Sequence, residues 1–185
     1  MKELSLNILD ITENSVKARA TLTEISLIED DKTLTIIIKD NGCGMSEDIV
    51  NSVTNPFYTT RTTRTVGLGI PLFKMAAEQT GGGLEILSIE DDGKNPLHGT
   101  TVKAYFFKNH IDYTPLGDIV TTLTTLIHGH PDVDFLYTHK NGENEVRLDT
   151  RELREVLEEV PLNSFEVLEW IKGYLLEQYN NFKKI

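Results

Sequence analysis

The chain has 185 residues, and its 29 acidic against 18 basic side chains give a formal net charge of −11. This length suits one domain of ordinary size with a small addition and a buried core. The negative charge repels polyanions, so we expect no nucleic-acid partner. Because no apolar stretch approaches the ~20 residues that span a bilayer and no signal pattern opens the chain, we expect a cytoplasmic protein without a membrane partner.

Periodicity and turn residues predict an alternation of helices and strands in the first part of the chain. The predicted elements are, in order, a helix over 4–19, strands over 21–28 and 33–39, a short helix from Ser46, a helix over 68–79, and strands over 83–90 and 100–107. Helices interleaved with antiparallel hairpins are typical of an α+β fold. We therefore predict a two-layer α/β sandwich over 1–108, with helices on one face of a mixed sheet.

The pattern changes after Lys108, where residues 109–115 are predicted to form a linker. A helix over 116–127, a hairpin over 134–150 and two short helices predict a small α+β addition over 109–185. The last helix carries an apolar face, which either packs on the hairpin or docks a partner, and packing is favoured. The residues of this face are Phe165, Leu168, Trp170, Ile171, Leu175 and Leu176.

The most informative stretch is DNGCGM, residues 40–45, which follows the β-branched strand over 33–39. The Asp40 carboxylate can accept a hydrogen bond from an exocyclic amine, while Gly42 and Gly44 leave room for a flat ring. This chemistry suits adenine. The alternative is that the Asp-Asn-Gly turn only closes an ordinary hairpin.

Three further blocks accompany this motif. On the first helix, four polar residues at i, i+3, i+4 and i+7 share one face: Asp10, Glu13, Asn14 and Lys17. The glycines of VGLGI, residues 66–70, open a later helix, where backbone N–H groups can approach phosphate oxygens. Thr100 places a hydroxyl beside Gly99 at the start of the last strand.

The four blocks, in this order and at these separations, resemble the GHKL superfamily of ATP-binding domains, which includes DNA gyrase, the large heat-shock chaperone, histidine kinases and MutL. The resemblance covers about residues 1–108 and implies ATP and Mg²⁺ as cofactors. It implies that Asn14 coordinates Mg²⁺, that Lys17 touches the phosphates and that Asp40 binds the adenine amino group. It further places in the nucleotide site Gly42, Gly44 under the ring, Met45, Gly67, Leu68, Gly69, and Thr100, which assists through water.

The same resemblance implies the catalytic candidates. Asp10 falls where related ATPases carry a glutamate that activates water, and aspartate is one methylene shorter. Glu13 lies on the same helix and is the second candidate.

Residues 55–67, NPFYTTRTTRTVG, correspond to the lid that the family closes over the triphosphate. By the resemblance, Phe57 matches the aromatic element often found at the start of this lid. Arginine forks and threonine hydroxyls suit phosphate oxygens, so Thr60 and Arg61 are predicted ligand-binding residues as well. The alternative is a solvated polar loop.

Cys43 and two histidines are residue types that can carry redox or metal chemistry. Cys43, the only cysteine, cannot form an internal disulfide, and we expect a small packing residue rather than a redox switch. His128 and His130 flank Gly129, but residues at i and i+2 do not share a helix face and no carboxylate or cysteine completes a set, so a metal site is not expected. None of His110, His128 and His130 lies in a helical hairpin of the phosphoacceptor type.

Two functions follow from the resemblance. In the first, a stand-alone histidine-kinase-like module binds ATP–Mg²⁺ and passes the γ-phosphate to a partner protein, as sensor kinases and anti-sigma-factor kinases do. In the second, the module is an ATP-dependent binding switch or slow ATPase that regulates a partner, in a hydrogenase or redox-sensing context that its tail resembles. The oligomeric state and the partner are not predicted.

Overall fold

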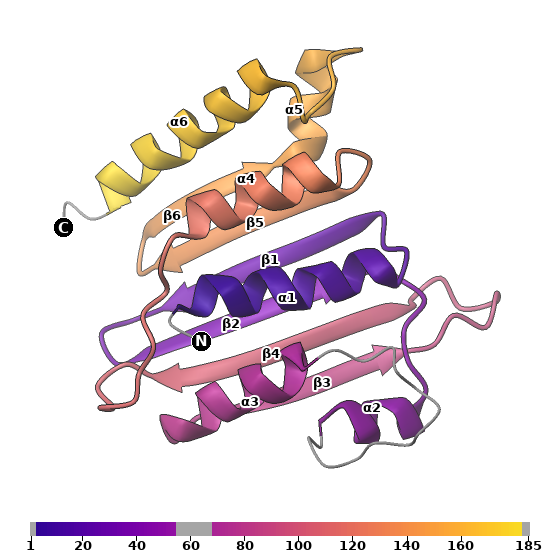
Figure 1. Ribbon diagram of the computed structural model, residues 1–185, viewed down its shortest axis with the longest axis vertical. Helices are drawn as coiled ribbons and strands as arrows, with labels where there is room; N and C mark the ends of the chain where they lie inside the picture. Colours follow the sequence, from indigo (N-terminus) through magenta and orange to yellow (C-terminus); the bar gives the residue numbers. More distant parts are fainter. Residues whose placement is uncertain (1–2, 55–67, 183–185) are drawn as a thin grey trace.

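The computed structural model describes residues 3–54 and 68–182. The helices and strands are α1 (Leu4–Lys17), β1 (Leu22–Glu29), β2 (Thr33–Asp40), α2 (Glu47–Val53), α3 (Gly69–Gln79), β3 (Gly83–Ile89), β4 (Gly99–Phe107), α4 (Ile119–Gly129), β5 (Asp134–Asn141), β6 (Asn144–Asp149), α5 (Thr150–Leu157) and α6 (Phe165–Phe182). These strands form one mixed sheet in the order β3-β4-β2-β1-β5-β6 (Figure 1).

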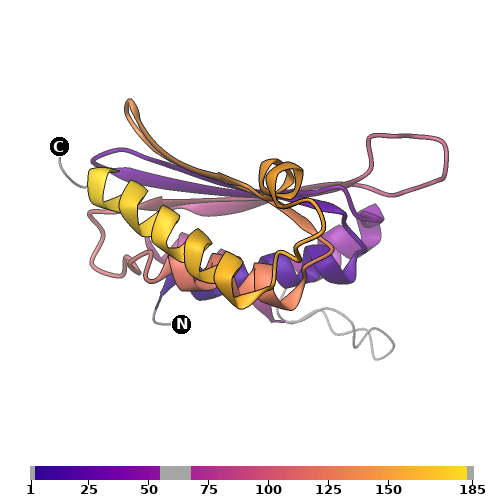
Figure 2. The same cartoon turned by 90° about the horizontal axis from the view of Figure 1, so that it is seen from above.

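One face of the sheet carries the main helices, in the order α3, α1, α4 and α6 from the β3 side to the β6 side (Figures 1 and 2). The predicted α+β fold with a two-layer arrangement is confirmed. No helix within the described ranges is long and apolar enough to cross a bilayer.

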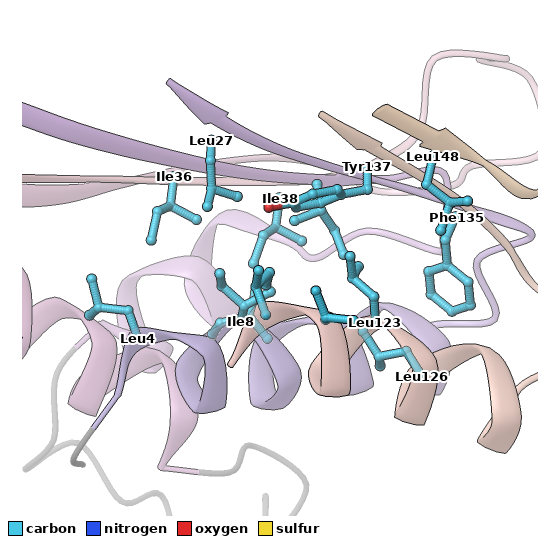
Figure 3. Close-up of a cluster of buried hydrophobic side chains, with 14 of the residues drawn as sticks. Leu4, Ile8, Leu27, Ile36, Ile38, Leu123, Leu126, Phe135, Tyr137 and Leu148 are labelled. Carbon is cyan, nitrogen blue, oxygen red and sulfur yellow. The ribbon is translucent and has the colours of Figure 1, made fainter. Parts of the chain in front are cut away.

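The core lies between these two layers because both contribute apolar residues with the period of their own secondary structure. On α1, Leu4, Ile8 and Ile11 recur on one side of the helix and are buried. On β1 and β2, alternate residues point to the helices, and Leu27 and Ile36 lie on this helix-facing side and are buried (Figure 3). This burial fixes which face of each strand meets the helices.

Strands from both predicted parts of the chain join in this sheet. β1 pairs antiparallel with β2, Ile25 opposite Ile38, and parallel with β5, Ile25 opposite Tyr137. The core is continuous across this pairing, since Tyr137 is buried with the other large side chains of the helix-facing side (Figure 3). The division of the chain at residue 108 stays a prediction.

The C-terminal helix differs from the prediction. Instead of two short helices, a short α5 is followed by an α6 of 18 residues. Its packed row is Val167, Ile171 and Leu175, which recur every four residues. The prediction that Phe165, Trp170 and Leu176 belong to a packing face is wrong, because they lie off this row and are 74%, 53% and 47% exposed.

A partly buried polar cluster fixes the end of α6 to the sheet. The hydroxyl of Tyr179 on α6 lies 2.8 Å from His139 Nδ1 on β5, and His139 Nε2 lies 3.3 Å from Glu29 Oε1 on β1. Lys108 Nζ approaches the other Glu29 oxygen at 3.0 Å. His139, and then Lys108, lower the pKa of the Glu29 carboxyl to about 2, so this half-buried carboxylate is charged and paired.

Candidate functional site

A cavity of about 900 Å³ lies between α1, α2, α3 and the sheet at β2 and β4. Part of its wall is apolar and comes from Ile38, Ile70 and Val102. Asp40 and Thr100 supply polar groups from the ends of β2 and β4. A concave, largely apolar pocket with a few convergent polar groups is the usual form of a small-molecule site.

Asp40 is the most constrained polar group of this cavity. It is 9% exposed, because it ends β2 beneath α1. Its Oδ1 accepts hydrogen bonds from the backbone N–H of Gly42 at 2.9 Å and of Thr100 at 3.2 Å. Its Oδ2 accepts from the Ser15 hydroxyl at 2.8 Å. Since a carboxylate has about four acceptor positions, the group is fixed in orientation and can still accept from a ligand.

A second hydrogen-bonded group holds the neighbouring wall. The hydroxyls of Ser88 on β3 and Thr100 on β4 lie 2.8 Å apart, and Ser88 Oγ accepts from the backbone N–H of Met45 at 2.8 Å. Ser88 also donates to the Gly99 carbonyl at 3.2 Å. Thr100 and Met45, which both line the cavity, are therefore positioned by one serine.

The glycines of the 40–45 loop allow it to pack closely on its neighbours. Gly44 has φ +66°, and a Cβ there would lie 1.9 Å from the Ile89 carbonyl oxygen. A Cβ on Gly42 would lie 2.8 Å from the Ala18 Cβ at the end of α1. The space that the missing side chains leave is thus filled by protein, whereas the sequence predicted that a ligand ring would occupy it. Gly44 lines the cavity as well.

The polar residues of α1 divide into two groups. Asn14, half-buried, and Lys17, exposed, line the cavity, whereas Asp10 and Glu13 are not among its lining residues. Asp10 faces the start of α3, where a Cβ on Gly69 would lie 3.2 Å from the Asp10 Cβ. Glu13 turns toward α4, and its Oε1 lies 2.8 Å from His130 Nε2.

The predicted site residues are therefore only partly brought together. Those that line the cavity are Asn14, Lys17, Asp40, Gly44, Met45 and Thr100. Leu68, 69% exposed, and Gly69 form the start of α3. Phe57, Thr60, Arg61 and Gly67 lie outside the described residues. The roles predicted for all of these residues stay predictions.

Ser15 and Ser88 were missed by the sequence reasoning. Ser15 had a signal, because it continues the buried Leu4, Ile8, Ile11 row of α1, and a buried hydroxyl needs a partner. Ser88 had no signal in the sequence, since its hydrogen-bond partners come from β4 and the 40–45 loop and depend on strand pairing.

A helix layer over a mixed sheet, with a buried carboxylate at a concave cavity, defines a ligand-binding α+β domain. The family model for histidine kinase-, DNA gyrase B- and HSP90-like ATPases matches residues 1–130. The chain belongs to this family, and the predicted resemblance is confirmed. Family membership supports ATP as the ligand of the domain.

Individual relatives agree with this family. The chain is similar to the signal transduction histidine-protein kinase AtoS of Escherichia coli (strain K12), with 29% identity over 93 residues, which is 50% of this chain and 15% of that protein. The curated relatives that it matches are much longer, and the chain covers only 15–16% of their length.

Solved structures share the fold at low identity. The Aquifex aeolicus MutL ATPase domain complexed with ADP matches with a TM-score of 0.51 and 17% identity, over 85% of this chain and 70% of that one. The N-terminal domain of a DNA repair protein matches with a TM-score of 0.56 and 16% identity, over 80% of this chain and 53% of that one.

Proposed function

We propose that the cavity binds ATP together with Mg²⁺ and that the chain transfers the γ-phosphate to a partner protein. The observation that carries the proposal is the buried Asp40 carboxylate, held through both oxygens at the cavity of a domain of this ATPase family. The ADP bound to the MutL domain of the same fold supports a nucleotide as the ligand.

The adenine ring fits the Asp40 end of the cavity. An exocyclic amino group is a donor, which matches a carboxylate that has only acceptor positions. The faces of a planar base are apolar, and the side chains of Ile38, Val102 and Ile70 line this cavity. A guanine carbonyl at the same position would face a carboxylate oxygen, so we expect adenine to be preferred over guanine.

The phosphates would lie between α1 and the start of α3. Lys17 supplies a positive charge, and the first turn of α3 supplies backbone N–H groups near Gly69 that have no acceptor within the helix itself. Asn14 offers an amide oxygen, a ligand that Mg²⁺ accepts alongside phosphate oxygens and waters. Within residues 3–54 and 68–182 no cluster of three or more His, Cys, Asp or Glu could hold a metal ion, so Asn14 and the triphosphate itself are the proposed ligands.

Bound ATP–Mg²⁺ would supply a phosphoryl group whose negative charge the metal partly neutralises. The protein would hold the triphosphate and the accepting group in the orientation that transfer requires. The similarity to a signal transduction histidine-protein kinase supports transfer to another protein. The second candidate, a binding switch or slow ATPase that regulates a partner, is favoured by the exposure of Asp10 and its short side chain. Cytoplasmic location and the redox context stay predictions.

Incubation with ATP labelled at the γ-phosphate, alone and with candidate partner proteins, distinguishes these functions. Label on the partner supports phosphotransfer, whereas release of inorganic phosphate alone supports a slow ATPase. Saturable ATP binding with neither outcome supports the switch. Failure to bind ATP in calorimetry would contradict the whole proposal.

Asp10 is the proposed base for attack of water on the γ-phosphate. We expect slow phosphate release by the isolated protein, a further loss of roughly tenfold or more with Asp10→Asn, and a gain with Asp10→Glu, whose longer side chain reaches further. Steady-state phosphate release at saturating ATP measures these rates. The matched control is Glu13→Gln, because Glu13 is paired with His130. Brisk hydrolysis that survives Asp10→Asn and falls with Glu13→Gln would assign the base to Glu13.

Ser15 is expected to position Asp40. In Ser15→Ala the Oδ2 atom of the buried carboxylate loses its protein donor, and we expect ATP affinity to fall by about fivefold, since one such bond contributes roughly 1 kcal/mol. Isothermal calorimetry measures this change. Thr54→Ala is the control, because among residues 3–54 and 68–182 the Thr54 hydroxyl bonds only carbonyls of α2. Equal losses in both variants would argue against a positioning role for Ser15.

A further inference from the structure

Among the described residues, Lys17 is the only basic residue that lines the cavity, and a carboxylate stands one helical turn before it. Glu13 precedes Lys17 by four residues and both lie within α1, so their side chains are neighbours on the helix surface. A glutamate four residues before a lysine is the favoured order for an ion pair on a helix. This spacing alone favours a Glu13–Lys17 pair, which would neutralise the cation that the cavity offers to phosphates.

The structure gives Glu13 a different partner, on the helix α4 that packs beside α1 (Figure 1). Glu13 Oε1 lies 2.8 Å from Nε2 of His130, which follows the last residue of α4. Within residues 3–54 and 68–182 Lys17 is exposed and forms no ion pair, and the residues outside these ranges include no aspartate or glutamate. The carboxylate is thus held on the α4 side of α1, and the Lys17 ammonium stays available to a ligand in the cavity.

His130 is placed beside Glu13 by contacts of the turn that carries it. Its backbone N–H donates to the Leu126 carbonyl at 2.9 Å, and its own carbonyl accepts from the Val133 N–H at 3.1 Å. Arg154 of α5 donates to the carbonyl of the next residue, Pro131. Because the family match ends at residue 130, Val133 and Arg154 hold this turn from the part of the chain beyond the match.

We propose that His130 is a positioning residue for the nucleotide site, which holds Glu13 away from Lys17 and so keeps the positive charge of Lys17 for the phosphates. The inference rests on the proposed function, in which Lys17 binds the phosphates of ATP. Without the His130 ring, Glu13 would turn toward Lys17, neutralise it and add a carboxylate beside the triphosphate. The C-terminal part of the chain would thereby set the affinity of the cavity for charged nucleotides.

Calorimetry on the full chain with ATP–Mg²⁺, and with adenosine as an uncharged probe, tests this inference. We expect His130→Ala to lower ATP affinity at least about threefold and to leave adenosine affinity unchanged, because adenosine has no phosphate. His130→Gln should retain ATP affinity, since its amide N–H can still donate to Glu13. His128→Ala is the matched control, because His128 is exposed at the end of the same helix and within the described ranges makes no bond to Glu13.

Two double variants separate control of charge from loss of packing. Adding Glu13→Gln to His130→Ala should restore ATP affinity, because no carboxylate then remains to pair with Lys17. In a Lys17→Ala background, His130→Ala should have a smaller effect than in the wild type, since the cation that it keeps unpaired is gone. Urea unfolding checks that each variant folds.

Three results would overturn this inference alone, in a wild-type chain that binds ATP. They are unchanged ATP affinity in His130→Ala, equal losses for ATP and adenosine, and no recovery with Glu13→Gln. Equal losses for the two ligands would mean that the Glu13–His130 pair only fixes the packing of α4 on α1. Failure of the wild-type chain to bind ATP would overturn the proposed function, and this inference with it.

Discussion

Asp40→Asn is expected to reduce ATP affinity by about a hundredfold, the largest effect of any single side chain in the cavity. An amide that keeps its oxygen on the N–H groups of Gly42 and Thr100 places an NH₂ at the Oδ2 position, which can no longer accept from a ligand amine. An unsatisfied buried donor costs about 1–3 kcal/mol, and each 1.4 kcal/mol is tenfold in affinity. Calorimetry with ATP measures the change.

Asp48→Asn is the matched control for this prediction. Asp48 lines the same cavity but is exposed, so its substitution removes the same charge without removing a fixed acceptor. We expect its ATP affinity to be unchanged or slightly raised, since a negative charge near the triphosphate is lost. Far-UV circular dichroism and thermal unfolding check that both variants fold. Full ATP affinity in folded Asp40→Asn would remove Asp40 from the adenine site.

The parts of the fold that could be predicted are those in which the spacing of apolar residues within one helix or strand reveals that element. The buried rows of α1 and the alternation along β1 and β2 follow from local periodicity, so the helices, strands and their two-layer arrangement could be read from the sequence. The parallel pairing of β1 with β5 could not, because it joins residues more than a hundred positions apart. No local signal specifies such a pair.

The connection before α4 shows a second limit of local patterns. Residues 109–115 read as a linker, yet the Pro115 and Leu116 carbonyls accept from the N–H groups of Leu4 and Ser5 at 2.9 and 2.8 Å. These bonds satisfy the start of α1, which has no side-chain cap. The predicted helix over 116–127 begins only at Ile119, because the Asp118 side chain accepts from the Thr121 N–H.

The candidate site was predictable to the extent that its motif is contiguous. Asp40, Gly44 and Met45 occupy one loop, and Asn14 and Lys17 one helix face, so composition and spacing indicated them. Ser88 and the ring of His98, whose Nδ1 lies 2.6 Å from the Gly42 carbonyl, support the same loop from distant positions. The geometry that holds the motif therefore depends on tertiary contacts, whereas its ligand chemistry depends on local residues.

Gly44→Ala is expected to destabilise the fold by more than about 3 kcal/mol and to weaken ATP binding together with it. A left-handed backbone costs alanine about 1–2 kcal/mol. At Gly44 the new Cβ would in addition lie 1.9 Å from the Ile89 carbonyl oxygen, so the loop must move. That movement would break the hydrogen bond from the Asp91 N–H to the Cys43 carbonyl, at 2.9 Å, and displace the wall beside Asp40.

Gly93→Ala separates the two costs. Gly93 has φ +72°, close to the +66° of Gly44, but a Cβ there would meet nothing within 4 Å. We expect this variant to lose only about 1–2 kcal/mol, the cost of the backbone conformation, and to keep its ATP affinity. Urea unfolding and calorimetry on both variants measure the difference. Equal losses of stability would mean that the loop yields freely at Ile89, and Gly44 would then be required only for its backbone conformation and not for close packing beside the cavity.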